Sequence, residues 1–461
     1  MISIAQSLIG MVCLLALAYL FSANRKAINW RLVGFGALLQ IILCLVINYF
    51  PPAREAFTSI SMSFVKLLSF AGEGARFVFG NDLASPGGKL GFIFVFNVMP
   101  IIIFFSAFTA LLYHFGILQR IVVVFAWVMQ RTMRLTGAES LAVAGNIFLG
   151  QTEAPLLVKP FIKGMSRSEL MTMMTGGLAH LSGSVLAAYV SFLGGADPNE
   201  QARFASFLLL SSVMNAPAAI MFAKMLLPET ERDAAKDGEK FEYDHGHHGH
   251  FINAVVQGTI DGVRLAVIVA SILIAFVSLI AMCNYLLHDV VGVWTGLNAV
   301  IKESTGGAFD GLTMQYIFGQ LFRVIAFAIG VSWNESLHVG SLLGQKIVIN
   351  EFVAYLDLAR MKSEGLLSDR AIVISTFALA SFANFSSVGI CVAGIGSMAP
   401  NQQKNLAQIG MRALFAAILA GLCTSCIANI FLYSNQTAAP APKVEVVKPA
   451  APASTPAPAA H

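Results

Sequence analysis

Apolar runs with few or no charges, each long enough to cross a bilayer, recur from the N-terminus to about residue 433. The hydrocarbon core of a bilayer is about 30 Å thick, and a helix of roughly 20 residues spans it. Only 12% of the residues are charged, against about 25% in soluble domains. The sequence therefore predicts an all-α polytopic membrane protein, and no stretch alternates in the way a barrel strand does.

Eight apolar segments are predicted to span the membrane. Their approximate ranges are 4–22, 32–50, 91–113, 170–193, 204–227, 265–282, 371–398 and 409–432. The loop after the first segment carries Arg25, Lys26 and Arg31, so the positive-inside rule places this loop in the cytoplasm and the N-terminus outside. Between the second and third segments, Phe57, Ile60, Phe64, Leu67 and Leu68 share one apolar face. This spacing predicts a helix that lies along the membrane interface.

Two further apolar stretches are interrupted by polar and charged residues. The first covers 137–160 and contains Glu153, and the second covers 332–355 and contains Glu351. A carboxylate at mid-depth costs about 2.5–3.5 kcal/mol on insertion scales, so both carboxylates should face a cavity inside the protein. Non-helical backbone at that depth is tolerated only where it lines such a cavity. Each stretch is therefore predicted to be a re-entrant hairpin.

The two stretches share an order of parts, which indicates an internal repeat. Allowing for gaps, the matching parts are Glu139-Ser140-Leu141 with Glu335-Ser336-Leu337, Leu149-Gly150-Gln151 with Leu343-Gly344-Gln345, and Thr152-Glu153 with Asn350-Glu351. Downstream, Ala-His-Leu-Ser at 179–182 matches Ala-Asn-Phe-Ser at 383–386, each inside an apolar segment that Gly and Ser interrupt. Paired hairpins and paired broken helices predict an inverted-repeat secondary transporter whose site lies near the membrane midplane.

At these residues the sequence resembles the concentrative nucleoside transporter family. The resemblance rests on GQTEAPLLVKP at 150–160, NEFVAY at 350–355 and SFANFSSVGI at 381–390, which occur in family order, and it covers roughly residues 1–433. It implies eight spanning helices, two re-entrant hairpins, a homotrimer, and elevator-like movement of a transport domain against a scaffold. It also implies ion-coupled uptake of nucleosides across the inner membrane of a bacterium, without an organic cofactor.

The resemblance further implies roles for individual residues. The groups implied to contact the nucleobase are Gln151, Thr152, Glu153, Val185 and Phe382. Those implied to bind the ribose are Glu351, Asn384 and Ser387. The chemistry agrees, because a carboxylate and an amide suit sugar hydroxyls. The groups that resemble the cation site of sodium-coupled members are Asn146, the carbonyl of Leu149, the position of His180 and the carbonyl of Leu181.

His180 departs from the family pattern, because sodium-using members tend to have a small hydroxyl residue at its position. An imidazole nitrogen is a poor ligand for a hard cation, which prefers oxygen. Histidine is also the side chain whose ordinary pKa lies nearest to physiological pH. Proton coupling is therefore the favoured prediction. The alternative is sodium coupling, with His180 only hydrogen-bonded to a carbonyl in the broken helix.

Other functional classes fit less well. A channel or an uncoupled facilitator is the alternative to a coupled transporter, because it would use the same midplane groups. An enzyme is not predicted. A membrane-embedded hydrolase would need a nucleophile with an adjacent general base, or a metal cluster. The histidine cluster at 245–250, however, lies in a polar loop, 229–250. The composition of that loop is compatible with metal binding, but a solvated connection is favoured. The formal net charge of +4 is scattered, which argues against a nucleic-acid partner.

The chain divides into five predicted parts. They are N-terminal scaffold helices with the interfacial helix (1–136), a first transport repeat (137–227), a polar loop with a scaffold helix (228–315), a second transport repeat (316–433), and a disordered tail rich in Ala and Pro (434–461).

Overall fold

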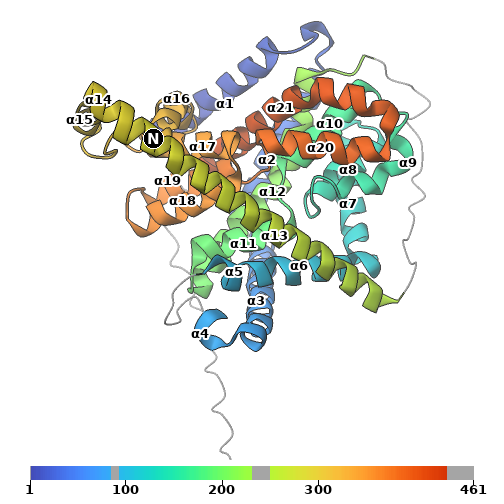
Figure 1. The fold of residues 1–461 in the computed structure, drawn as a ribbon. Helices are drawn as coiled ribbons and strands as arrows, with labels where there is room; N and C mark the ends of the chain where they lie inside the picture. Colours follow the sequence, from blue (N-terminus) through green and yellow to red (C-terminus); the bar gives the residue numbers. More distant parts are fainter. Residues whose placement is uncertain (1, 85–92, 231–249, 433–461) are drawn as a thin grey trace, which may run out of the picture.

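The computed structural model describes residues 2–84, 93–230 and 250–432, and every regular element within these ranges is helical (Figure 1). The histidine-rich part of the polar loop and the Ala/Pro-rich tail lie outside the described residues. The all-α prediction is therefore confirmed for the part of the chain that the structure covers.

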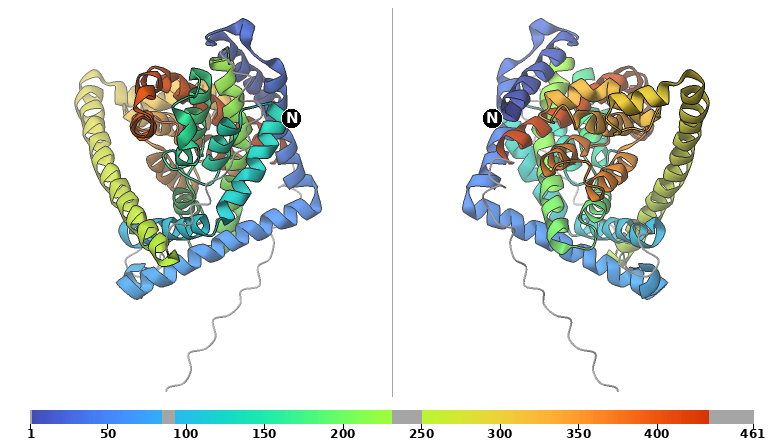
Figure 2. Two further views of the ribbon diagram at one scale, coloured as in Figure 1. Left: turned by 90° about the vertical axis from the view of Figure 1, so that its right-hand side faces the viewer. Right: turned by 90° about the vertical axis from the view of Figure 1, so that its left-hand side faces the viewer.

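The described residues of the N-terminal part form seven α-helices and one 3₁₀ turn. These are α1 (Ile2–Leu20), η1 (Arg25–Ala27), α2 (Trp30–Tyr49), α3 (Pro51–Phe79), α4 (Asn81–Ala84), α5 (Phe94–Asn97), α6 (Met99–His114) and α7 (Ile117–Met133). Helix α3 begins with two prolines, which the first helical turn accepts because its N–H groups have no intrahelical partner. It crosses the base of the bundle (Figure 2) and turns Val65, Leu68 and Ala75 toward it. This course is the one expected of an interfacial helix.

Two sets of helices follow the same order of hairpin, broken helix and long helix. The first set is α8 (Gly137–Asn146), η2 (Ala154–Val158), α9 (Lys159–Ile162), α10 (Arg167–Ala179), α11 (Gly183–Gly194) and α12 (Pro198–Leu226). The second set, which α16 (Met314–Ala328) precedes, is α17 (Ser336–Val348), α18 (Glu351–Ser363), α19 (Asp369–Leu379), α20 (Phe385–Met398), η5 (Pro400–Gln402) and α21 (Gln403–Phe431). The repeated order agrees with the internal repeat read from the sequence.

Between the two sets lies α13 (Phe251–Asn284), which continues as a π-helical segment, η4 (Tyr285–Gly292), and is followed by α14 (Val293–Thr295) and α15 (Leu297–Ser304). The prediction that this span covers 265–282 was too short. Asp261 and Arg264 end the uncharged run, but charged side chains do not interrupt a helix whose backbone hydrogen bonds are complete. The helix therefore begins well before the apolar window does.

Each of the eight predicted segments overlaps an apolar helix of the described residues. In the part of the chain that the structure describes, six helical stretches are long and apolar enough to cross a membrane: Trp30–Tyr49, Phe94–His114, Arg167–Gly194, Pro198–Leu226, Phe251–Thr295 and Pro400–Phe431. Two shorter apolar helices, Ile4–Leu20 and Phe385–Met398, account for the other two predicted segments. The seventh predicted segment, 371–398, is two helices, α19 and α20, because the chain leaves the helical path at residues 380–384.

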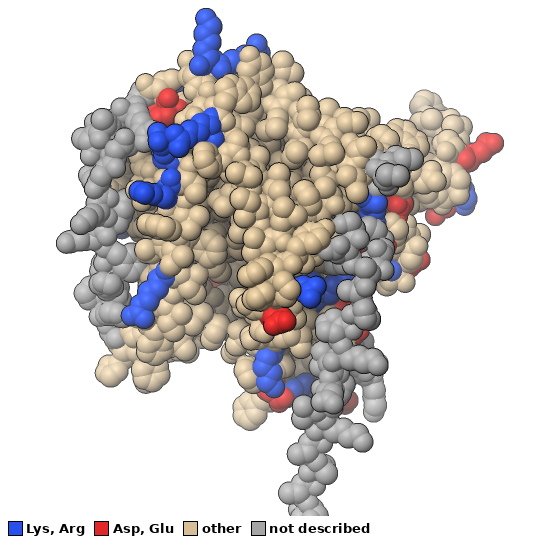
Figure 3. All heavy atoms as spheres, turned by 180° about the vertical axis from the view of Figure 1, so that it is seen from behind, with Lys and Arg blue, Asp and Glu red and all other residues tan. Residues whose placement is uncertain are grey.

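The core is formed by the two repeated sets of helices, and α13 stands at one side of them (Figure 2). In the apolar window of α10 and α11, 89% of the residues are buried, against 11% in that of α13. Helix α13 packs on α6 through a G-x-x-x-G pattern, Gly258 to Gly262: a Cβ on Gly262 would lie 2.7 Å from the Cα of Ile103. Small residues at this spacing let two helices approach closely. On the face shown in Figure 3, a broad uncharged surface occupies the middle, as expected of a lipid-facing belt.

Candidate functional site

The two broken helices meet at their breaks. Helix α10 ends at Ala179 and α19 ends at Leu379, and each end leaves carbonyl groups without helical partners. The side chain of Asn215, in the middle of α12, donates to the carbonyls of both Ala179 (2.8 Å) and Ala380 (3.1 Å). The backbone N–H of Phe382 donates to the carbonyl of His180 at 3.2 Å. One asparagine and one backbone bond therefore join the breaks of the two repeats.

The predicted ribose-binding residues come together at this junction. Glu351 begins α18 and is 3% exposed. Its two carboxylate oxygens each accept a hydrogen bond, Oε1 from the hydroxyl of Tyr189 at 3.1 Å and Oε2 from the amide of Asn384 at 2.8 Å. Asn384 is the N-cap of α20, where its Oδ1 accepts from the backbone N–H of Ser387 at 2.8 Å. The second hairpin and the second break thus form one polar cluster.

The predicted base-binding residues of the first hairpin lie in the turn between α8 and η2, facing the second repeat. The Oε1 atom of Gln151 accepts from the thiol of Cys391 on α20 at 3.3 Å. The γ-methyl of Thr152 lies 2.8 Å from the position that a Cβ on Gly394 would occupy, so a larger residue there would have to displace Thr152. Glu153 is exposed, and its Oε2 accepts from the backbone N–H of Gly150 at 3.2 Å. The hairpin tip therefore lies against α20, with the side chain of Glu153 exposed in the single chain.

The two apolar residues assigned to the base, Val185 and Phe382, are located by their position on the chain and not by polar contacts. Val185 is 2% exposed on α11 and lies one helical turn before Tyr189, so that both share the face toward Glu351. Phe382 lies in the second break and is partly buried. No polar contact can identify either residue, since both side chains are apolar.

The predicted cation residues surround the end of α10. His180 is 1% exposed, and its Nδ1 lies 2.7 Å from the carbonyl of Gly176. Its Nε2 makes no well-formed hydrogen bond within the described residues, although the backbone of Ser212 lies close enough to interact with the ring. The carbonyls assigned to Leu149 and Leu181 belong to adjoining turns, which a bond from the N–H of Gly183 to the carbonyl of Phe148 (3.1 Å) ties together.

Asn146 belongs to the same group. A Cβ on Gly176 would lie 3.3 Å from its Nδ2, so the side chain touches the end of α10. The Nδ2 atom donates to the carbonyl of Ala142 at 2.9 Å, and the fully buried Oδ1 has no partner among the described residues. A buried oxygen without a donor is the kind of group that a cation would satisfy.

Sequence reasoning missed Tyr189, Asn215 and Lys346. Lys346 is 2% exposed, and its Nζ donates to the carbonyl of Ala378 and to the hydroxyl of Ser381, both at 2.7 Å. A cation is favourable there because the last carbonyls of a helix carry partial negative charge. The sequence signal that could have identified Lys346 was its position inside a membrane hairpin. Burial of an ionisable residue at that depth costs free energy, so such a residue usually has a functional or structural role.

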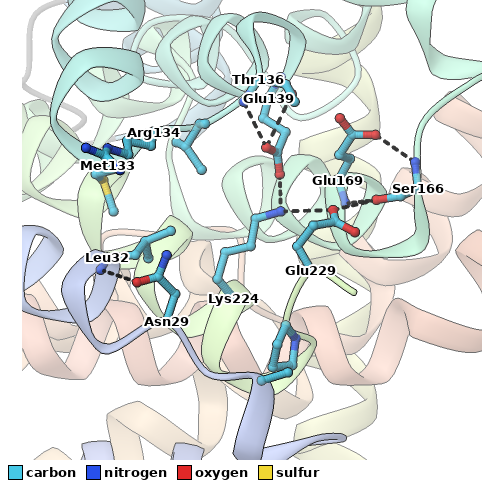
Figure 4. Close-up of a pocket in the computed structure, with 13 residues that line it drawn as sticks. Asn29, Leu32, Met133, Arg134, Thr136, Glu139, Ser166, Glu169, Lys224 and Glu229 are labelled. Carbon is cyan, nitrogen blue, oxygen red and sulfur yellow. Dashed lines mark hydrogen bonds and ion pairs between the residues drawn. The ribbon is translucent and has the colours of Figure 1, made fainter. Parts of the chain in front are cut away.

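A cavity of about 200 Å³ lies elsewhere, at the end of the bundle that carries residues 25–31 (Figure 4). Lys224 on α12 reaches into it and pairs with Glu139 on α8, donates to the hydroxyl of Ser168 at 3.0 Å, and lies 3.6 Å from Glu229. Ser166 also donates to Glu229 at 2.7 Å. Because these charged groups engage one another, the cavity marks a junction between helix ends, and none of the predicted substrate residues lines it.

Three family models match successive parts of the chain. They are described as Na+ dependent nucleoside transporter N-terminus (residues 9–82), Nucleoside recognition (95–196) and Na+ dependent nucleoside transporter C-terminus (207–429). An uncharacterized transporter of Haemophilus influenzae is 38% identical over 93% of this chain and 98% of its own length. Sodium/nucleoside cotransporter 1 of Homo sapiens is 37% identical over 92% of this chain, which spans 63% of that relative.

The fold also matches solved structures. The structure of CNTnw in an inward-facing substrate-bound state is 37% identical, with a TM-score of 0.83, and the match covers 94% of this chain and 98% of that one. A variant of CNTnw in an outward-facing state matches with the same TM-score of 0.83 and covers 94% and 99% of the two chains.

Proposed function

This chain belongs to the Na+-dependent, concentrative nucleoside transporter family, and from that premise we propose that it accumulates nucleosides across the bacterial inner membrane by coupling to an ion gradient. Membership makes it a multi-pass membrane transporter and not an enzyme. The substrate residues, the coupling ion and the oligomeric state are the parts that the proposal adds.

The observation that carries the proposal is the Glu351 carboxylate at the junction of the two broken helices. Each carboxylate oxygen has two lone pairs, and Tyr189 and Asn384 use one on each. One acceptor position on each oxygen therefore remains for the ribose hydroxyls. We assign the ribose to Glu351, Asn384 and Ser387. The base is assigned to Gln151, Thr152 and Glu153 of the facing hairpin, with Val185 and Phe382 as the apolar contacts.

Transport would follow the movement of the two repeats, 137–227 and 316–433, against a scaffold formed by 1–136 and 228–315. The close α6–α13 packing and the low burial of α13 support the scaffold assignment, because α13 offers a large apolar surface to lipid or to further copies. CNTnw has been solved in inward-facing and outward-facing states. We propose that this chain alternates between two such states within a homotrimer.

Analogues lacking the 2′- or 3′-hydroxyl are expected to compete about 10-fold less well than the parent nucleoside. Loss of a hydroxyl leaves a buried acceptor or donor of Glu351 or Asn384 without its partner, and such a group is costly where water is excluded. The measurement is inhibition of labelled nucleoside uptake in cells or proteoliposomes. Equal inhibition by the parent and by both deoxy analogues would contradict the assignment of the ribose to these residues.

His180 supports a proton, rather than sodium, as the coupling ion. Its contact with the Gly176 carbonyl is best satisfied by a neutral ring with the proton on Nδ1, which leaves Nε2 to take up a second proton. Histidine is the side chain best suited to exchange a proton near neutral pH. The sodium alternative has support in the unpartnered Oδ1 of Asn146 and in the names of the human relative and the family models.

With each gradient imposed alone on proteoliposomes, a proton gradient is expected to drive accumulation, and a sodium gradient at symmetric pH is not. His180→Ser, which restores the hydroxyl of sodium-using members, is expected to shift the dependence from protons to sodium. Accumulation driven by sodium and indifferent to pH would overturn proton coupling. Equilibration without accumulation under either gradient would instead favour the channel or facilitator alternative.

A further inference from the structure

Tyr189 connects the first repeat to the carboxylate that we assign to the ribose. It lies on α11, is fully buried, and donates its hydroxyl to Oε1 of Glu351 at 3.1 Å, across 162 residues of sequence. Its ring stacks on Tyr355, with centroids 4.2 Å apart and planes 22° apart, and makes a T-shaped contact with Phe352 at a centroid distance of 4.9 Å. Packing on two sides therefore fixes the ring and, with it, the position of the hydroxyl oxygen.

We propose that Tyr189 is a positioning residue that holds the Glu351 carboxylate in the orientation needed to read both ribose hydroxyls. The inference rests on the proposed function, because it concerns the same carboxylate. It adds a residue from the first repeat to a ribose site that otherwise consists only of residues from the second.

The physical reason is the freedom of a carboxylate. Rotation of its terminal torsion is broad, so a single hydrogen bond does not fix where both oxygens point. Asn384 holds Oε2, and its own orientation is fixed because its Oδ1 caps α20. The hydroxyl of Tyr189 holds Oε1. With both oxygens held, the two remaining acceptor positions keep a constant spacing, which two neighbouring hydroxyls can match and a single hydroxyl cannot.

Tyr355 provides a matched control. It is also fully buried and shares the stacking contact, but its hydroxyl donates to the carbonyl of Thr376 at 2.7 Å. Both Tyr→Phe substitutions keep the stacked rings and remove one buried hydrogen bond. Only Tyr189→Phe removes a bond to Glu351.

The experiment measures KM for a ribonucleoside and for its 2′- and 3′-deoxy analogues in wild-type protein, Tyr189→Phe and Tyr355→Phe. For Tyr189→Phe we expect the KM of the ribonucleoside to rise about 10-fold, because hydrogen bonds to charged groups are among the stronger ones in proteins. The KM values of the deoxy analogues should rise less, so the ratio of the analogue KM to the ribonucleoside KM should fall. Tyr355→Phe should leave this ratio unchanged, even if less protein is inserted, because KM does not depend on the amount of transporter.

An unchanged ratio in Tyr189→Phe, or an equal change in both variants, would overturn the inference. If Tyr189→Phe shows no measurable uptake, the test is the thermal shift that the ribonucleoside produces on the purified protein. Loss of this shift in Tyr189→Phe alone supports a positioning role for Tyr189. A shift that Tyr189→Phe retains overturns that role. Glu351→Gln separates this failure from that of the proposed function. Normal uptake by Glu351→Gln removes the ribose assignment itself, whereas an inactive Glu351→Gln with a wild-type ratio in Tyr189→Phe removes only the role of Tyr189.

Discussion

Glu351→Gln is expected to abolish nucleoside uptake, with a loss of at least about 100-fold, while the protein still inserts and folds. A site built to hydrogen-bond substrate hydroxyls loses that much when an essential acceptor is missing. The glutamine amide has one acceptor oxygen in place of two. Its NH₂ group must therefore occupy one of two positions that now accept hydrogen bonds.

The neighbours decide which position the NH₂ group takes. The amide of Asn384 cannot reverse, because its Oδ1 accepts from the backbone of Ser387 and the hydroxyl of Ser386, both at 2.8 Å. The hydroxyl of Tyr189 can rotate and accept instead of donating. The NH₂ group should therefore point toward Tyr189, which preserves the buried network and the fold. The acceptor that we assign to one ribose hydroxyl is nevertheless lost.

The measurement is initial uptake of a labelled nucleoside, normalised to the amount of inserted protein. Glu153→Gln is the matched control, since Glu153 is exposed and accepts one backbone hydrogen bond. Its effect should be much smaller, because contacts made through water tolerate the change. Near-normal uptake by Glu351→Gln would rule out this carboxylate as the group that binds the ribose.

Lys346→Met is expected to destabilise the folded protein by about 2 kcal/mol or more and to prevent transport. Removal of the ammonium leaves the carbonyl of Ala378 and the hydroxyl of Ser381 without the donor they share, and a buried unsatisfied group costs about 1–3 kcal/mol. Methionine relieves the cost of burying a charge. That gain does not compensate, because Lys346 also interacts electrostatically with Glu351, whose carboxylate would lose a neighbouring cation.

A double-mutant cycle tests this account. In thermal unfolding of the purified protein, Glu351→Gln should recover part of the stability that Lys346→Met loses, because it removes the carboxylate that the ammonium compensated. Lys224→Met is the control: Lys224 is also buried, but it pairs with Glu139 at one end of the bundle. The loss of stability caused by Lys224→Met should simply add to the effect of Glu351→Gln. A wild-type melting temperature for Lys346→Met, or equal coupling of both lysines to Glu351, would show that Lys346 does not have this role.

The sequence by itself determined the membrane architecture. Apolar composition over about 20 residues is a local quantity, and the bilayer imposes the same length on every span. The cost of charge in lipid also singled out Glu153 and Glu351 without any knowledge of their neighbours. The motifs around them then carried the resemblance from which the family was predicted, and the family models and relatives confirmed that prediction.

Tertiary structure alone decided which groups lie together. Tyr189 reaches Glu351 across 162 residues, and Asn215 joins carbonyls that belong to different repeats. Neither residue differs in sequence from an ordinary tyrosine or asparagine in an apolar helix, because a hydrogen bond depends on where its partner lies. The extent of α13 also escaped prediction, since hydropathy registers the loss of apolar character at Asp261, whereas the helix is held by backbone bonds that side-chain polarity does not break. Local chemistry thus predicted the spans and the residues that lipid cannot accommodate. The partners of those residues depended on how the two broken helices meet.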